Sequence, residues 1–175
     1  MAIGIGGRRM DPVRGYNFLV SLVDTSSALG TLVSGVQNVV LAGFSECSGL
    51  ETELSTEDYE EGGNNGTVLH FPKRVTWGRL RLKRGAALTD ELWNWHNGFV
   101  QGAGKRRDGI IMLQDDQHKP VKSWFFTRGL PVKWTGPSMN ALQAEVAIEE
   151  LEIVHEGLNA HTPGSIIGGL VKSFF

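Results

Sequence analysis

The stretch Val75-Thr-Trp-Gly-Arg-Leu-Arg-Leu-Lys83 alternates between apolar and charged side chains, which is the pattern of a half-buried β-strand. Leu80 and Leu82 are expected to face the core. The opposite face would then carry Trp77, Arg79, Arg81 and Lys83. This stretch therefore predicts a strand that is packed on one side and polar on the other.

Similar short apolar runs recur on both sides of this stretch and predict a mainly β fold. In the run that starts at Tyr16, Phe18, Val20 and Leu22 would share one face. A dense turn signal, Glu61-Gly-Gly-Asn-Asn-Gly66, separates two further runs, the second of which is expected to end at Pro72. The other predicted strands are Val39–Phe44, Leu50–Tyr59, Thr67–Phe71, Gly109–Leu113, Val121–Phe126 and about Ala144–His155.

The last of these strands changes its phase. Val146 and Ile148 are in phase with each other, whereas Leu151 and Ile153 fall on the other parity. A slip of this kind predicts a bulge or a strong bend at Glu149–Glu150.

One helix is predicted, at about residues 89–101. Thr89 is expected to be its N-cap, and Asp90 and Glu91 in the first turn suit the positive end of the helix dipole. Gly102 can end it. The residues that recur with helical spacing, and so should face the core, are Leu92, Trp95 and Phe99.

Length and composition indicate one ordinary domain. The chain has 175 residues, of which 41% are hydrophobic and 21% charged, so disorder over the whole length is excluded. No apolar run approaches the roughly 18–20 residues of a membrane-spanning helix, and residues 1–12 lack the apolar core of a signal peptide. The single cysteine, Cys47, cannot form an internal disulfide. Residues 1–15, rich in glycine and arginine, are expected to be an arm outside the core.

No motif in the sequence indicates an enzyme. The five histidines are not spaced as zinc ligands, and nothing around Cys47 indicates a nucleophile. The glycines of residues 4–7 do not follow a strand, so a phosphate-binding loop is not supported. The acidic pairs Asp115–Asp116 and Glu149–Glu150 are more simply a turn and a solvated or interfacial strand face. We therefore expect no catalytic residue, no metal site and no cofactor.

The charges are segregated along the chain. Glu46–Glu61 contains seven acids and no base, Lys73–Arg84 six bases and no acid, and Glu145–Glu156 five acids and no base. These segments could be solvated faces that balance one another within one chain. Alternatively, an acidic projection of one copy could fit a basic surface of the next, which would set the register and direction of an assembly.

Eight strings, in order over about residues 11–158, resemble the tail tube protein family of contractile bacteriophages and of phage-like contractile injection systems. They are Asp11-Pro-x-Arg-x-Tyr-Asn-Phe18, Gly43-Phe-Ser-Glu-Cys-Ser-Gly-Leu50, Tyr59-x-Glu-Gly-Gly-Asn-Asn-Gly66, Leu82-Lys-Arg-Gly85, Leu92-Trp-x-Trp95, Arg106-Arg-x-Gly109, Lys133-Trp-x-Gly-Pro137 and Glu145-Val-Ala-Ile-Glu-x-Leu-Glu-x-x-His-Glu-Gly-Leu158.

The resemblance implies a small antiparallel β-barrel or sandwich with one flanking helix, over residues 16–158. It implies hexameric rings that stack into an inner tube, with the sheets of the subunits lining the lumen as one continuous barrel. A hairpin at about 50–71 would contact the neighbouring ring. The implied partners are the sheath, the baseplate and hub, a tube terminator and possible lumen cargo. The protein would be made in the bacterial cytoplasm and become part of a phage tail or injection particle.

Two segments depart from the family pattern. The stretch 25–38 is longer than the usual connection between the first two strands, and residues 159–175 extend beyond the usual end. They leave open a second role, as the tube-initiating or adaptor ring on the baseplate.

The expected contacts between subunits fall into three groups. The first group lies on the hairpin, the second on the basic strand, and the third on an apolar stripe of the C-terminal extension. They are Glu57, Asp58, Glu60, Glu61, Asn64 and Asn65; Arg79, Arg81 and Lys83; and Ile166, Ile167, Leu170, Phe174 and Phe175.

A barrel that binds single-stranded nucleic acid is the alternative from another class. It would need Arg79, Arg81 and Lys83 to follow the phosphates, with aromatic side chains between them for stacking. Trp77 is the only aromatic residue expected on that face, and the net charge is −2. Specific binding of nucleic acid or of membranes by the isolated subunit is therefore not expected.

Overall fold

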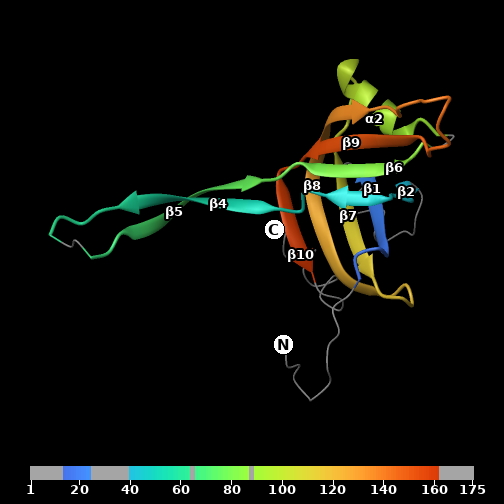
Figure 1. Cartoon of the computed structure of the whole chain (residues 1–175). Helices are drawn as coiled ribbons and strands as arrows, with labels where there is room; N and C mark the ends of the chain where they lie inside the picture. The colour runs from blue at the N-terminus through green and yellow to red at the C-terminus, as the bar shows by residue number, and fades with distance from the viewer. Residues whose placement is uncertain (1–13, 25–39, 64–65, 87–88, 162–175) are drawn as a thin grey trace.

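The computed structural model describes residues 14–24, 40–63, 66–86 and 89–161, and in them the chain is mainly β-structure with one helix, as predicted (Figure 1). The helix is α2 (Glu91–Val100). The strands are β1 (Phe18–Asp24), β2 (Val40–Ala42), β3 (Glu46–Ser48), β4 (Thr52–Tyr59), β5 (Leu69–Trp77), β6 (Leu80–Gly85), β7 (Arg107–Gln114), β8 (Pro120–Thr135), β9 (Ile148–Val154) and β10 (Gly157–His161).

Eight of the strands form one antiparallel sheet. Its order is β2-β1-β7-β8-β9-β6-β3, and β10 also pairs with β8. The 16-residue strand β8 joins the two halves, because its first part pairs with β7 and β10 and its second part with β9. At the join, Arg128 has φ 53° and its backbone N–H donates to Asp108 Oδ1 at 2.6 Å. We expected a barrel or a sandwich. The described strands do not close into a barrel, so the closed form is not found within one chain.

The core lies between the two halves of this sheet and under the helix. The alternation predicted for the run that starts at Tyr16 and for the stretch 75–83 is confirmed. The side chains of Val20 and Leu22, and those of Leu80 and Leu82, are buried. Gly109 lets two strands approach closely, because a Cβ there would lie 2.3 Å from the ring of Phe126. The side chains with no exposed surface are Val20, Leu22, Leu80, Leu82, Leu92, Phe126, Leu151 and Ile153.

Helix α2 packs on β8 through the predicted face but begins later than expected. Asp90, not Thr89, is the N-cap residue, and its side chain makes no capping hydrogen bond. The carbonyl of Thr89 instead accepts a hydrogen bond from Arg84 Nη2 at 3.2 Å, which turns this residue toward the sheet. The core-facing side chains are, as predicted, Leu92, Trp95 and Phe99.

The stretch 75–83 forms two strands instead of one. Strand β5 ends at Trp77, the N–H of Gly78 donates to the carbonyl of Glu51 at 3.1 Å, and β6 then begins. Trp77 therefore does not share a sheet face with the arginines of β6. The backbone at residue 49 lies so close to the start of β6 that only glycine fits there. Gly49 has φ +84°, and a Cβ on it would lie 1.9 Å from the Arg79 carbonyl oxygen.

Strand β5 also continues through Pro72, where we expected it to end. Pro72 pairs with Thr56 on β4. Among the described strands β5 pairs only with β4, so one edge of β5 carries no partner strand and the missing N–H breaks no ladder.

Of the bulge or strong bend expected at Glu149–Glu150, the bulge is absent. The pairing of β9 with β6 is regular from Ile153 to Ile148, and the register shift lies on β8 instead, at Val132. Ile148 faces outward, whereas Glu149 points inward. The phase change in the sequence therefore reflects a buried carboxylate and not a bulge of β9. Strand β10 carries the sheet on to residue 161, past the expected domain end at 158.

Candidate assembly interface

The β4–β5 hairpin projects from the rest of the molecule as a two-stranded ribbon (Figure 1). It reaches from residue 52 to residue 77, six residues further than the predicted hairpin, because β5 extends past Phe71. All of its described side chains are exposed except that of Trp77, which is partly buried at the root. The ring centroid of Trp77 lies 6.0 Å from that of His155, so the root is anchored in the body of the protein.

The acidic residues expected to make contacts lie on the outer half of this ribbon. Asp58 and Glu57 each have a partner on β5, His70 at 2.6 Å and Lys73 at 3.4 Å respectively. Within the described part of the chain, Glu60 and Glu61 make no ion pair. The tip therefore presents uncompensated negative charge.

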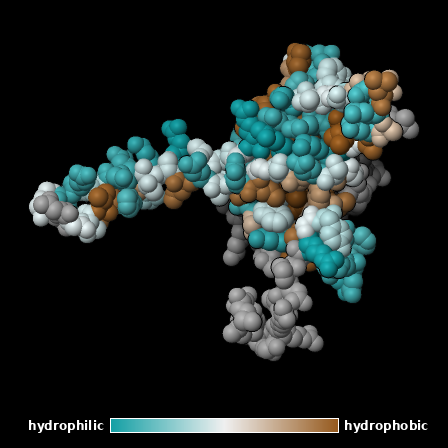
Figure 2. Space-filling model, viewed as in Figure 1, coloured by the Kyte–Doolittle hydropathy of each residue, from teal (hydrophilic) through white to brown (hydrophobic). Residues whose placement is uncertain are grey.

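The sequence interpretation missed the apolar side chains of the ribbon. Leu54 faces Val75 across the two strands, and Tyr59 contacts Phe71 edge to face with ring centroids 6.1 Å apart. These four side chains are 47–54% exposed. Figure 2 shows apolar groups at two separate places along the ribbon. Leu69 and Phe71 alternate with polar residues in the sequence, which indicates an apolar face on this strand. Alternation alone does not show whether that face is buried or exposed.

The basic residues expected to make contacts surround a carboxylate of their own chain. Arg79 lies 3.5 Å from Glu152, whose side chain is only 9% exposed, and Arg81 and Lys133 each lie 3.7 Å from it. Lys133 completes this group from β8 and was not predicted. Three cations around one carboxylate give this group of side chains a net positive charge, and we call these four residues the basic cluster.

Lys83 is not part of the basic cluster. Its Nζ donates to Glu46 on β3 at 2.9 Å, and this hydrogen bond raises the pKa of Lys83. Arg84, on the other face of β6, donates to Glu149 at 2.5 Å in the buried interior. Much of the charge segregation seen in the sequence is therefore balanced within one chain.

Other segments that the sequence singles out, including the remaining expected contacts, cannot be placed. Most of the N-terminal arm, the stretch 25–38, the tip residues Asn64 and Asn65, and the C-terminal stripe lie outside the described residues. The stripe residues are Ile166, Ile167, Leu170, Phe174 and Phe175.

Open strand edges form a second kind of surface. In the described sheet β10 pairs only with β8, and β2 pairs only with β1. These two strands are the edges of the sheet half β2-β1-β7-β8-β10. An unpaired edge can accept a strand from another chain.

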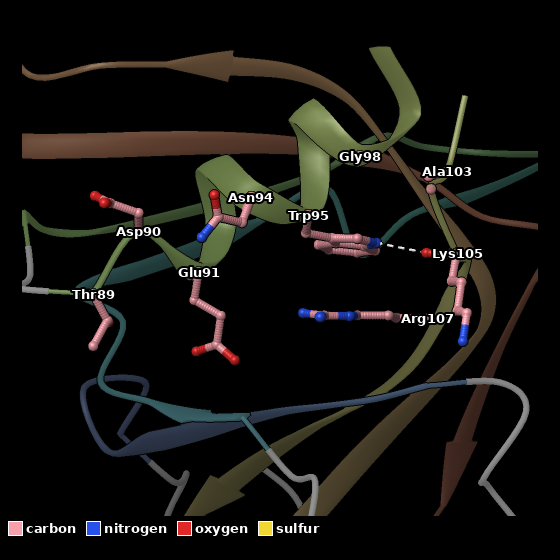
Figure 3. Close-up of a pocket in the computed structure, with 10 residues that line it drawn as sticks. Thr89, Asp90, Glu91, Asn94, Trp95, Gly98, Ala103, Lys105 and Arg107 are labelled. Carbon is pink, nitrogen blue, oxygen red and sulfur yellow. Dashed lines mark hydrogen bonds between the residues drawn. The ribbon is translucent and has the colours of Figure 1, made fainter. Parts of the chain in front are cut away.

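A cleft of 570 Å³ lies beside helix α2. Trp95 Nε1 donates to the Lys105 carbonyl at 2.8 Å, and the Arg107 guanidinium lies 5.1 Å from the Trp95 ring centroid. Figure 3 shows the side chains of Glu91 and Arg107 pointing toward each other across the cleft. The described residues that line the cleft include no His, Cys or Ser.

Two side chains, the partly buried Cys47 and the buried His155, have perturbed acidity. Burial raises the pKa of the Cys47 thiol to about 11, so the thiol stays protonated near neutral pH. Burial also lowers the pKa of His155, which lies between the rings of Trp77 and Phe126 at 6.0 Å from each. Within the described residues, no group of three His, Cys, Asp or Glu side chains is arranged to hold a metal ion. No described helix is long and apolar enough to cross a membrane.

Solved structures with the same fold come from contractile injection systems. A chain of the anti-feeding prophage (AFP) baseplate is 24% identical with a TM-score of 0.76, over 89% of this chain and 99% of that one. A chain of the AFP tube-terminating cap is 20% identical with a TM-score of 0.73, over 89% and 94%. A chain of the sheath–tube complex of the extracellular contractile injection system PVC is 22% identical with a TM-score of 0.70, over 86% and 92%.

A comparison with curated proteins gives no match. The family model described as T4-like virus tail tube protein gp19 matches residues 14–159, which include all the described strands except the last two residues of β10. The predicted resemblance is thereby confirmed, and it concerns a family of structural proteins. The chain belongs to the T4-like virus tail tube protein gp19 family.

Proposed function

We propose that this chain is a structural subunit of the inner tube of a contractile phage tail or phage-like injection system. Six copies would form a ring, and rings would stack into a conduit inside a contractile sheath. The subunit contributes shape and contacts, and no catalytic step or cofactor is needed. Sheath contraction would drive the tube through a target envelope.

The observation that carries this proposal is the projecting ribbon. A two-stranded hairpin is marginal on its own in water, and this one packs on the body only at its root. It nevertheless exposes large apolar side chains beside uncompensated acids. Exposed apolar groups with a charged surround are typical of protein–protein contact sites. The ribbon is therefore best explained as an arm that is completed by another subunit.

The open edges support the ring. Strands β2 and β10 bound one half of the sheet, so pairing β10 of one copy with β2 of the next would continue that half from subunit to subunit. Such a contact uses two different surfaces, and head-to-tail contacts of this kind close into rings when the rotation permits. Closure would also remove the exposed edges.

The proposed contacts between rings are made by the acidic outer half of the ribbon, together with Asn64 and Asn65. The C-terminal stripe, residues 162–175, is proposed to dock on a neighbouring subunit or on a baseplate component. The sheath, the baseplate and hub, and a terminator are the proposed further partners. Assembly would begin in the bacterial cytoplasm and end in the particle.

The tube-initiating or adaptor ring is the second candidate. The chain with a TM-score of 0.76 comes from a baseplate, and a terminating-cap chain is similar as well, so the fold is compatible with rings at either end of a tube.

Charge reversal on the ribbon tests the stacking. Replacing Glu57, Asp58, Glu60 and Glu61 by lysine should leave the melting temperature unchanged and block tubes in negative-stain micrographs. Glutamine or asparagine at the same four positions is the matched control and should shorten tubes less. Tubes of normal length from the lysine variant would refute the proposed contact.

Deletion of residues 162–175 tests the proposed docking of the C-terminal stripe. Loss of assembly with an unchanged melting temperature of the monomer would support docking on a neighbour. A destabilised monomer that still assembles would show that the segment folds back on its own chain. No change in either would remove the segment from the proposal.

A further inference from the structure

We propose that the loop between β8 and β9 is the docking site for the C-terminal stripe of another copy of this chain. The proposal rests on the tube subunit proposed above and specifies one of its contacts. The stripe lies beyond the region that the family model matches, which ends at residue 159. The docking surface, which we call the loop patch, consists of Met139, Leu142, Val146 and Ile148.

The loop patch exposes four large apolar side chains within a short stretch of chain. Met139 is 87% exposed, Leu142 94%, Val146 76% and Ile148 46%. Figure 2 shows apolar groups at this loop, at the end of the body that lies away from the ribbon. Single apolar side chains are ordinary on a protein surface, whereas a group of them in one place is typical of a contact site.

The loop is shaped by hydrogen bonds of its own. It runs over residues 136–147, and neighbouring antiparallel strands are usually joined by only about two to five residues. Asn140 Oδ1 accepts from the N–H of Leu142 at 3.0 Å, and Asn140 Nδ2 donates to Gln143 Oε1 at 3.0 Å. The apolar side chains therefore lie on a preformed turn, and a partner loses little free energy in ordering it.

The chain itself contains a segment that matches the loop patch in character. In residues 162–175 apolar side chains recur every four residues, which predicts a short helical stripe. The charged side chain of that segment is Lys172, and that of the loop is Glu145. An apolar contact with one opposite charge on each side suits both surfaces, whereas the acidic half of the ribbon would bring like charge to Glu145.

The whole stripe cannot cover the loop patch of its own chain. His161, at the end of β10, pairs with Ser123, and the loop begins after Thr135 at the far end of β8. At about 3.3 Å per residue, these two points lie roughly 28 Å apart even with a right-angled bend at Arg128. Ile166 reaches at most about 18 Å past His161 on a fully extended chain. Figure 1 likewise shows the end of β10 and the loop well apart, so another copy must supply the stripe.

A contact between two different ends of the chain repeats from copy to copy. Each subunit would give its own stripe to one neighbour and accept the stripe of another. This is the head-to-tail arrangement from which closed rings and continuous tubes are built. The contact therefore suits a subunit that assembles with itself.

Photo-cross-linking with isotope labels identifies what covers the loop patch. Benzoylphenylalanine is introduced at Leu142 of the full chain, which is then mixed with an excess of isotope-labelled, heavy chain before assembly and irradiation. Mass spectrometry of the digest should find a heavy peptide from residues 162–175 joined to the loop. The light peptide alone would show a contact within one chain and would overturn the proposal. A peptide from another segment, or assembled particles without a cross-link, would overturn it as well.

Paired substitutions test whether the loop patch and the stripe act together. Leu142→Ser with Val146→Ser should leave the melting temperature unchanged, because both side chains are exposed, and should raise the protein concentration needed for assembly at least about tenfold. Deletion of residues 162–175 should shift this concentration by a similar factor, and the combination should shift it no further. Ala141→Ser with Ala144→Ser, on the same loop, is the matched control and should assemble normally.

The outcomes separate this inference from the proposed function. Additive shifts, or normal assembly of the variant with two serines in the loop patch, would contradict the contact. If the unaltered chain formed tubes in which the loop patch cross-links elsewhere, this inference alone would be overturned. If the unaltered chain stayed monomeric at every concentration, the proposed function would fail together with this contact.

Discussion

The buried ion pair between Arg84 and Glu149 should be a main determinant of stability. Arg84 Nε donates to Glu149 at 2.5 Å, and the two side chains are only 5% and 10% exposed. Glu149 also accepts a hydrogen bond from Trp134 Nε1 at 3.0 Å, and Arg84 reaches the carbonyl of Thr89. The pair thus ties β6, β8 and β9 to the residues that lead into helix α2.

Removing one charge should leave the other uncompensated in the interior. Breaking a buried pair in this way costs about 3–5 kcal/mol, so Glu149→Gln should lower the free energy of unfolding by that amount. At roughly 2–4 °C per kcal/mol for a chain of this size, the melting temperature should fall by about 6–20 °C. Replacing both partners, as Arg84→Met with Glu149→Leu, should cost far less because no charge is left buried.

The neighbouring Glu150 is the matched control. It faces outward across from Lys83, so Glu150→Gln should change stability by less than about 1 kcal/mol. Urea unfolding followed by circular dichroism, at one fixed protein concentration because self-association shifts apparent stability, measures both variants. A cost below about 1 kcal/mol for Glu149→Gln, or equal costs for the two variants, would refute the assignment of Glu149 to the interior.

Three further predictions concern single side chains. Trp95→Ala should cost about 3–5 kcal/mol in urea unfolding, because Trp95 is 4% exposed, and the 41% exposed Trp93 should cost less. Burial lowers the pKa of folded His155 below the unfolded value of about 6.5, so the free energy of unfolding should fall as the pH drops below that value. His155→Asn should reduce this loss of stability, and the same pH profile for the variant and the unaltered chain would contradict the prediction. Cys47 should react with iodoacetamide at pH 8 about tenfold slower than a free thiol, as mass spectrometry can measure; equal rates would contradict its burial.

Local patterns in the sequence were sufficient for the core. Alternation identified the inward residues Leu80 and Leu82, and the helical spacing of Leu92 and Trp95 identified the packed face of α2. Each of these signals depends on a few neighbouring residues, so the rest of the fold does not alter it. The acidic hairpin was found for the same reason, since its charges and its turn residues are contiguous.

Features that depend on distant partners could not be predicted. Glu149 is buried because Arg84, 65 residues away in the sequence, lies on the adjacent strand. Without knowledge of that partner, the alternation at Glu149 predicted a change of strand phase. The predicted strand ended at Pro72, because the sequence does not show that this strand has a single partner among the described strands. The apolar pairs of the ribbon were missed since an alternating strand is normally half buried. Only the structure places them on a projection in solvent.

Electron cryomicroscopy of the purified full-length chain tests the ring most directly. We expect end views with six-fold symmetry around an open lumen, from particles whose mass is a multiple of about 115 kDa, which is six chains of 19.1 kDa. Side views should show stacked rings with a ribbon from each subunit in contact with the next ring. A population that stays monomeric at every concentration, or closed particles without a lumen, would contradict the account.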